Sequence, residues 1–141
     1  MENFNWISIA IAGLVPSIIG FIWHHPKVFG NVYDQSIGEE AVQMQKGHRP
    51  IVHILAFVFS YVIALYLPYI VVHEVTEFAT FKHGAYHAAI AALHLAIPLV
   101  VVNYLYEQKP FKYILLNVLY WLISISIMGG IISAMAIKEI F

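Results

Sequence analysis

The segment Trp23-His24-His25-Pro26-Lys27-Val28-Phe29-Gly30 decides how this chain is organised. An apolar run of membrane-spanning length precedes it, and the longest polar stretch of the protein follows it. An aromatic ring, two imidazoles, a helix-breaking proline and a lysine follow one another here, which is typical of a helix leaving a bilayer. We therefore interpret Trp23, Pro26, Phe29 and Gly30 as a membrane-exit motif.

The composition around this segment is that of a membrane protein. The chain has 141 residues, of which 61% are hydrophobic and 11% are charged, and its mean hydropathy is +0.78. Soluble domains carry about 25% charged residues. The formal net charge of −1 offers no basic surface for nucleic acid, so we expect no nucleic-acid partner. The absence of cysteine excludes disulfides, thiolate metal sites and thiol catalysis.

Four apolar runs predict four transmembrane helices, because each is near or above the roughly 18 to 20 residues that span a bilayer. Their expected ranges are about 6–23, 51–72, 85–106 and 111–137. The fold class is therefore all-α: a polytopic membrane protein whose residues 1–141 form a single transmembrane domain. Met1–Asn5 contains Glu2 and no lysine or arginine, which does not resemble a signal peptide, so the first run is expected to be a retained helix.

Small residues recur at spacings of three and four in every run, which predicts closely packed helices. The four sets are Ala10, Gly13, Ser17 and Gly20; Ala56, Ser60 and Ala64; Ala85, Ala89, Ala92 and Ala96; and Ser126, Gly130 and Ala134. We expect a compact four-helix bundle. Pro16, Pro68 and Pro98 should each bend or interrupt their helix.

The distribution of positive charge predicts the orientation in the membrane. Four spans place both termini on one side, and five of the seven lysine and arginine residues lie on the opposite side, with the first and third loops. By the positive-inside rule those two loops are expected in the cytoplasm and both termini outside. In the first loop, Glu39 and Glu40 come before Lys46 and Gly47, which predicts a short interfacial helix.

Eight histidines are the residues most open to a functional interpretation. His83, His87 and His94 share one face of a continuous helix, and they predict a polar pathway for protons or metal ions. Pairing of His94 with another ring as axial ligands of haem is a second hypothesis. The structural alternative is that neutral His94 hydrogen-bonds a neighbouring helix while the other two rings are solvated at the interface.

Two further histidine groups lie at the membrane boundaries. On the outer side, His73, Glu77, His83 and His87, with Glu74, form a candidate site for zinc or another divalent ion, or simply a solvated loop. On the cytoplasmic side, four rings could gather, or could be interface residues beside Trp23. These four are His24, His25, His48 and His53.

The motif Trp23-x-x-Pro26-x-x-Phe29-Gly30, the opening Asn5-Trp6 and the stretch Gly38-Glu39-Glu40 resemble a family of small bacterial membrane proteins, the domain of unknown function family 1761. The resemblance covers nearly the whole chain and implies a multi-pass protein of the bacterial inner membrane. It supplies no activity, cofactor or catalytic residue. Typical members carry a Tyr-Ser pair where this chain has His24-His25.

These observations favour a non-enzymatic accessory, assembly or structural subunit that is embedded in the lipid bilayer. It is expected to associate with itself as a homo-oligomer or with a larger membrane complex, and to have no cofactor. Two alternatives remain open at this stage. One is a small transporter or channel that uses the His83, His87 and His94 face, and the other is a haem- or metal-binding membrane protein.

Overall fold

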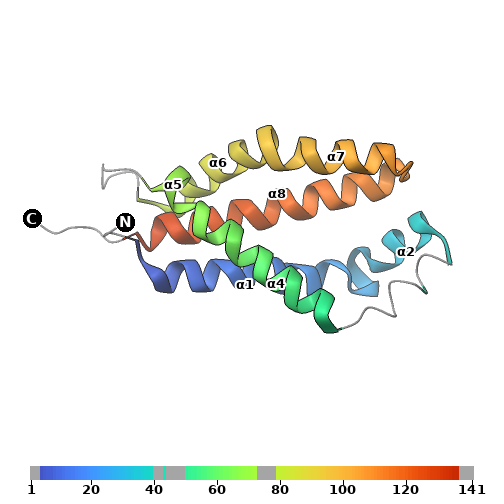
Figure 1. The fold of residues 1–141 in the computed structure, drawn as a ribbon, viewed down its shortest axis with the longest axis horizontal. Coiled ribbons are helices and arrows are strands. Elements are labelled where there is room, and N and C mark those ends of the chain that lie inside the picture. Colours follow the sequence, from blue (N-terminus) through green and yellow to red (C-terminus); the bar gives the residue numbers. More distant parts are fainter. Residues whose placement is uncertain (1–3, 40–42, 44–49, 73–78, 137–141) are drawn as a thin grey trace, which may run out of the picture.

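The computed structural model describes residues 4–39, 43, 50–72 and 79–136. All regular structure in these ranges is helical, and four helices are long and apolar enough to cross a membrane. The expected all-α fold is therefore confirmed, and the four helices pack against one another. Helices α1 and α8 and the third span run along the long axis of the molecule, whereas α4 lies obliquely across α1 (Figure 1).

The first span is helix α1, Trp6–Trp23, and the fourth is α8, Phe111–Ala134. The second span is divided into α4, Pro50–Tyr66, and α5, Pro68–Val71. The third begins at Phe81, four residues before the expected Ala85, because the Thr80 hydroxyl accepts a hydrogen bond from the His83 amide at 3.2 Å and caps the helix. It comprises α6, Phe81–Ala91, a widened π-helical turn η3, Ala92–Ala96, and α7, Ile97–Tyr106.

The prolines explain two of these interruptions. Pro68 is the first residue of α5, and Leu67 separates it from the last residue of α4, Tyr66. Pro98 has no amide hydrogen to donate to the carbonyl of His94, and the widened turn η3 accommodates this loss immediately upstream. Pro16 does not interrupt its helix, because α1 continues through it.

The first loop turns back on the bundle. A π-helical turn η1, Pro26–Gly30, leads into helix α2, Asn31–Ile37, which ends at Gly38 with a φ of +83°. The short helix expected around 41–46 lies almost wholly outside the described residues. Within that range Gln43 is described and is helical, as is Glu39 before it. The longest helical part described in this loop is α2, which follows the membrane-exit motif and η1.

Helix α8 is the centre of the arrangement, because it packs against both α6 and α1 (Figure 1). Helix α4 crosses α1 at a steep angle and contacts mainly that helix. The Asn5 side chain donates a hydrogen bond to the Met135 carbonyl at 2.8 Å, which joins the start of α1 to the end of α8. We call this the termini end of the molecule, and the end with α2 and the α7–α8 turn the loop end.

Small residues do form the tightest contact, although not in the expected register. The expected Ala92 is buried, in η3. On α6 the buried positions are Gly84 and Ala88, rather than Ala85 and Ala89. On α8 they face Gly129 and Ser133, rather than Ser126 and Ala134. In α4 the expected Ser60 and Ala64 are buried. The expected register of the third span was therefore right at Ala92 but wrong at Ala85 and Ala89, where the buried face is shifted by one residue.

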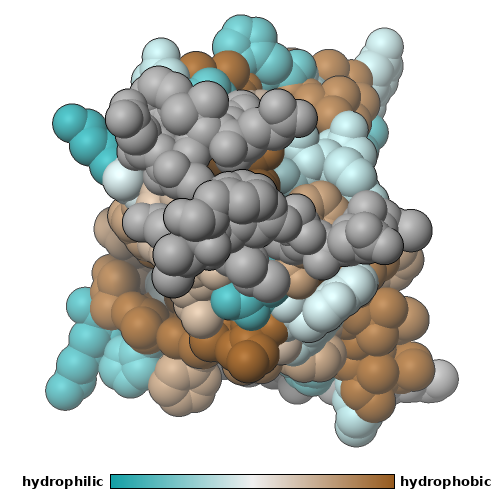
Figure 2. Space-filling view, turned by 90° about the vertical axis from the view of Figure 1, so that its left-hand side faces the viewer, coloured by the Kyte–Doolittle hydropathy of each residue, from teal (hydrophilic) through white to brown (hydrophobic). Residues whose placement is uncertain are grey.

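The outer surface is apolar over much of its area. Large exposed hydrophobic side chains occur on every span, for example Phe21 at 81% and Leu95 at 65% exposed. Seen from the termini end, apolar side chains form much of the visible lower and right-hand outline (Figure 2). Such a surface is the counterpart of hydrocarbon chains rather than of water.

Candidate functional site

A pocket of about 760 Å³ lies toward the loop end, between α1, α4, α8 and the first loop. Its volume falls within the roughly 300–1,000 Å³ that is common for ligand sites. The residues that line it are Pro16, Ser17, Gly20, Phe21, His24, Gly30, Tyr33, Asp34, His53, Ala56, Phe59, Ser60, Tyr120 and Trp121.

The pocket exists because α1 and α4 touch in one place and then separate. At the contact, the ring of Tyr61 lies over Gly13, where a methyl group would come within 2.9 Å of ring atoms. The Tyr61 hydroxyl donates to the Ala10 carbonyl at 2.8 Å. Toward the loop end, all ten residues 50–59 of α4 are exposed, so this half of the helix stands away from the bundle. The space beside it is the pocket.

One wall of the pocket is fixed by hydrogen bonds between spans. The Tyr120 hydroxyl of α8 donates to the Pro16 carbonyl of α1 at 2.7 Å. Gly20 leaves room for this ring, because a methyl group there would lie 3.3 Å from the Tyr120 hydroxyl oxygen. On α4, the buried Ser60 hydroxyl donates to the Ala56 carbonyl at 2.9 Å, so it is satisfied within its own helix.

His24 is held in a defined orientation at the polar end of the pocket. Its Nδ1 lies 2.9 Å from the Gly20 carbonyl oxygen, which can only accept, so Nδ1 carries the hydrogen. In the neutral ring Nε2 is then an acceptor. The ring stands edge-on to Tyr33, with centroids 5.1 Å apart at 85°, and lies 5.9 Å from Tyr120.

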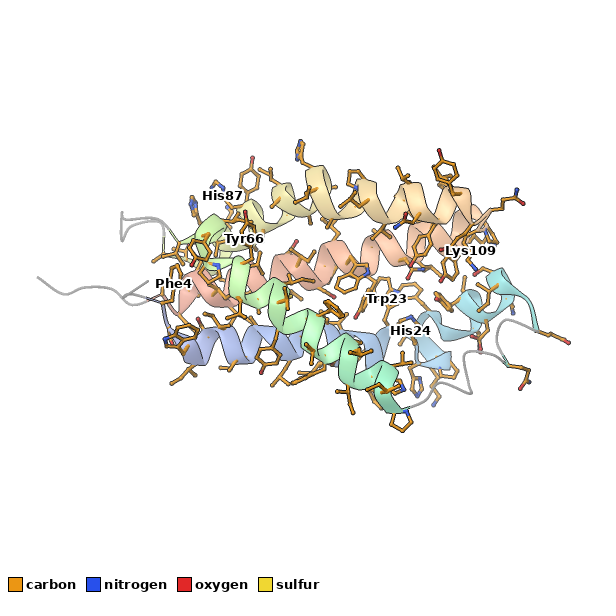
Figure 3. All side chains as sticks on the ribbon, in the orientation of Figure 1. Phe4, Trp23, His24, Tyr66, His87 and Lys109 are labelled. Atoms are coloured by element: carbon orange, nitrogen blue, oxygen red, sulfur yellow. The ribbon has the colours of Figure 1, made fainter. Side chains whose placement is uncertain are left out.

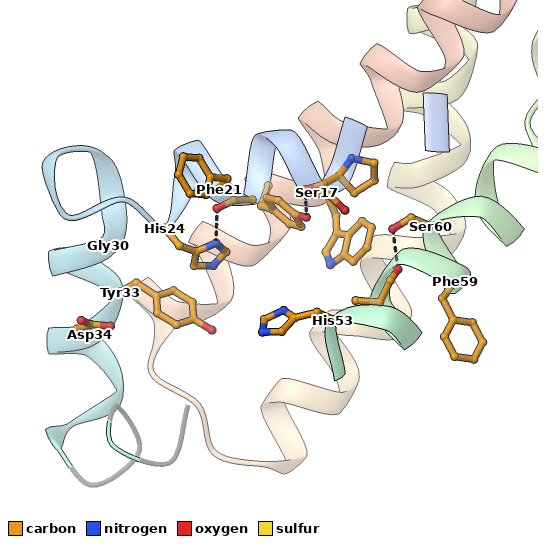
Figure 4. A pocket seen from close by; sticks show the side chains of 14 residues that line it. Ser17, Phe21, His24, Gly30, Tyr33, Asp34, His53, Phe59 and Ser60 are labelled. Atoms are coloured by element: carbon orange, nitrogen blue, oxygen red, sulfur yellow. Dashed lines mark hydrogen bonds between the residues drawn. The ribbon is translucent and has the colours of Figure 1, made fainter. Parts of the chain in front are cut away.

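The polar groups gather at one end of the pocket. The rings of His24, Tyr33 and His53 lie on this side of the close-up, with Asp34 beside Tyr33, whereas Ser60 and Phe59 lie at the other side (Figure 4). The result is an amphipathic cavity with imidazole, phenol and carboxylate groups at the membrane boundary and aromatic and aliphatic walls deeper in.

The membrane-exit motif forms a tight chain reversal that positions α2. Trp23 packs on Phe29 with ring centroids 4.5 Å apart. Gly30 is buried, and a methyl group there would collide with the His24 carbonyl. The reversal brings Tyr33 of α2 against Tyr113 of α8, with centroids 4.9 Å apart. The motif therefore has a clear structural role in forming the floor of the pocket.

The rings of His83 and His87 lie together on α6 at the termini end, with centroids 4.4 Å apart (Figure 3 labels His87). His94 lies in the widened turn η3, near the middle of the helix Phe81–Tyr106. Its side chain is exposed on the surface of the bundle, and its Nδ1 lies 2.8 Å from the Ile90 carbonyl oxygen. The structure thus brings the first two rings together and places the third on the exposed outer surface of the bundle.

The candidate metal site is only partly described. His73, Glu74 and Glu77 lie outside the described residues, as does His48. In the part of the chain that the structure describes, no group of three or more His, Asp or Glu side chains is arranged to hold a metal ion. The metal hypothesis therefore remains a prediction.

Of the four cytoplasmic-side histidines, the structure brings His24 and His53 to the same pocket. His25 accepts a hydrogen bond from the Lys27 amide at 3.2 Å and caps η1 instead. The sequence interpretation missed Tyr33, Asp34 and Tyr120. Tyr33 and Asp34 could have been found, because they lie three and four residues after Gly30 of the motif, which is the spacing of one helical face. No pattern in the sequence shows where α4 separates from α1 to form the pocket.

The fold and its surface define the class: this is a multi-pass helical membrane protein with four spans. Residues 7–133 match the family described as protein of unknown function (DUF1761), and the chain belongs to that family. The resemblance noted from the exit motif is thereby confirmed. Searches of curated proteins and of solved structures returned no match.

Proposed function

We propose that this chain is a non-enzymatic accessory or assembly subunit of the bacterial inner membrane, and that its third span docks against another transmembrane helix. That helix belongs to a second copy of the chain or to a larger membrane complex. The proposal rests on one observation, the position of His94 on the outer surface of an apolar span.

An ionisable ring facing lipid is costly, and such residues usually meet a partner. The Ile90 carbonyl uses the Nδ1 hydrogen of His94, which leaves Nε2 as an acceptor directed away from the helix backbone. A hydroxyl, amide or imidazole donor on a neighbouring span would satisfy it. Polar contacts of this kind contribute about 0.6–1.7 kcal/mol between helices in membranes.

The surroundings of His94 suit helix docking better than transport. Leu93, Leu95 and Leu99 are 48%, 65% and 62% exposed, so a single polar group is surrounded by apolar contact area. A pathway through one chain would need His83, His87 and His94 to line a common interior. Because His94 is on the outside of the bundle, this geometry favours association over the transport hypothesis.

Photo-crosslinking in native membranes tests the proposal. A photoreactive amino acid is placed at Ile90, one turn before His94 and exposed, and at Ile18 on α1 as the control position. We expect one discrete crosslinked product from Ile90 and none from Ile18. His94→Leu should weaken association by roughly 3- to 18-fold in a titration against the isolated partner.

His25→Leu is the matched control, because it removes an exposed imidazole that lies outside the spans. The proposal fails if Ile90 gives no product, or if His94→Leu leaves the crosslink and the affinity unchanged. Recovery of the protein as a monomer that turns over a substrate would overturn it as well.

A further inference from the structure

We propose that the pocket between α1, α4 and α8 binds one phospholipid whose headgroup carries a primary amine, as in phosphatidylethanolamine. The inference is independent of the docking role of His94. It rests on three features of the pocket: its opening to the bilayer, the depth of its polar end, and the hydrogen-bonding character of the groups found there.

The pocket is accessible from within the membrane. Because residues 50–59 of α4 stand away from the bundle, the space between α1 and α4 opens sideways to lipid. Phe21 and Phe59, which are 81% and 63% exposed, border this opening, and Ala56 and Trp121 line the wall behind it. An acyl chain can enter there by lateral diffusion and lie against apolar side chains.

The polar end of the pocket lies at headgroup depth. His24 follows the last residue of α1, and Trp23 and Lys27 on either side are residue types that collect at the membrane interface. Lys109, in the turn at the same end of the molecule, marks the same boundary (Figure 3). A lipid whose chain lies beside Trp121 therefore has its headgroup near His24 and Asp34.

Two of the groups at this end can accept hydrogen bonds, the imidazole of His24 and the carboxylate of Asp34. The Nε2 of neutral His24 is an acceptor, because Nδ1 donates to the Gly20 carbonyl. The side chain of Asp34 is half-buried. The ion pair found among the described residues joins Lys109 to Glu107 at 3.8 Å and does not involve Asp34. Asp34 lies at the same end of the pocket, beyond the ring of Tyr33 (Figure 4). A cation with several N–H donors complements an imidazole acceptor together with a carboxylate at this end.

This pattern distinguishes among common headgroups. A primary ammonium has three N–H donors and a positive charge. The choline ammonium has the charge without any donor, and the glycerol headgroup has hydroxyl donors without the charge. The pocket should therefore prefer ethanolamine lipids over choline and glycerol lipids with the same acyl chains.

Fluorescence quenching by brominated lipids tests the preference. Trp6→Phe and Trp23→Phe leave Trp121, in the wall of the pocket, as the single reporter. The full chain is reconstituted in unbrominated phosphatidylcholine, with chain-brominated phosphatidylethanolamine, phosphatidylcholine or phosphatidylglycerol added in increasing mole fraction. We expect half-maximal quenching by the ethanolamine lipid at a mole fraction about tenfold lower, equivalent to one charge-assisted hydrogen bond.

Asp34→Asn should reduce this tenfold preference to about twofold or less, whereas Glu39→Gln, an exposed acid of the same loop that does not line the pocket, should retain it. Ala56→Leu fills the apolar wall and should weaken quenching by all three lipids. Equal quenching by the three lipids in the unsubstituted pocket would overturn the proposal. A preference that survives both Asp34→Asn and Ala56→Leu would also overturn it.

Discussion

Gly84 of α6 and Gly129 of α8 face each other so closely that a methyl group on either would collide with the carbonyl oxygen of the other. This pair lies in the tightest helix contact of the fold. We expect Gly84→Ala to force the two helices apart and to lower the free energy of unfolding by about 1–3 kcal/mol, the usual cost of overpacking. Denaturation in detergent, followed by circular dichroism, measures the change.

Ile18→Phe is a suitable control, because it adds a larger side chain at an exposed position of α1. It should leave the unfolding midpoint nearly unchanged. If Gly84→Ala were as stable as the parent chain, the close approach of α6 and α8 would be refuted.

The hydroxyl of Tyr61 should stabilise the contact between α1 and α4, because it donates to the Ala10 carbonyl at 2.8 Å. Tyr61→Phe keeps the ring over Gly13 and removes only this hydrogen bond. We expect a loss of about 0.6–1.7 kcal/mol in unfolding free energy. Tyr66→Phe, at an exposed position of the same helix, should cost nothing measurable, and equal losses in the two variants would contradict the assignment.

Asn5 combines two roles that substitution can separate. Its side-chain oxygen accepts from the Ile7 and Ser8 amides and caps α1, while its nitrogen donates to the Met135 carbonyl. Asn5→Ala should destabilise by about 1 kcal/mol from the cap alone, with a further loss from the second bond. Asn5→Asp keeps the cap but not the donor, so its unfolding midpoint should lie between those of the parent and the alanine variant.

The orientation expected from the positive charges can be tested directly, because the chain has no cysteine to remove. Gln108→Cys probes the α7–α8 turn and Lys82→Cys probes the start of α6, at opposite ends of the molecule. In cells, a maleimide that cannot cross the membrane holding the chain should label Lys82→Cys from outside. Gln108→Cys should be labelled only after that membrane is disrupted. The reverse pattern would show that the loops lie outside.

The sequence predicted those features of the fold that depend on consecutive residues, namely the positions of the transmembrane helices. Run length and apolarity are properties of consecutive residues, so the range 6–23 and the start of the fourth span at Phe111 agree with the helices found. Packing register depends on the contacts that a helix makes with its neighbour. Gly84 and Ala88 are buried against α8, one residue from the expected Ala85 and Ala89, whereas the expected Ala92 is buried.

The pocket could not be predicted in the same way. His24 and His53 were recognised as rings that could gather at one boundary, but Asp34 and Tyr120 reach the site only through tertiary structure. The chain reversal at Gly30 brings α2 back to α8, and the crossing of α4 over α1 opens the space. Both depend on contacts between residues far apart in the sequence.

The central position of α8 has a consequence for biosynthesis. The first three spans emerge from the ribosome before the helix that packs against both α1 and α6 has been made. Until Phe111–Ala134 is inserted, α6 lacks the partner for its glycine face, and α1 lacks the tyrosine that binds its Pro16 carbonyl. The chain therefore reaches its final packing only after Phe111–Ala134 has been made, and a product truncated before Phe111 would leave these surfaces of α1 and α6 uncovered.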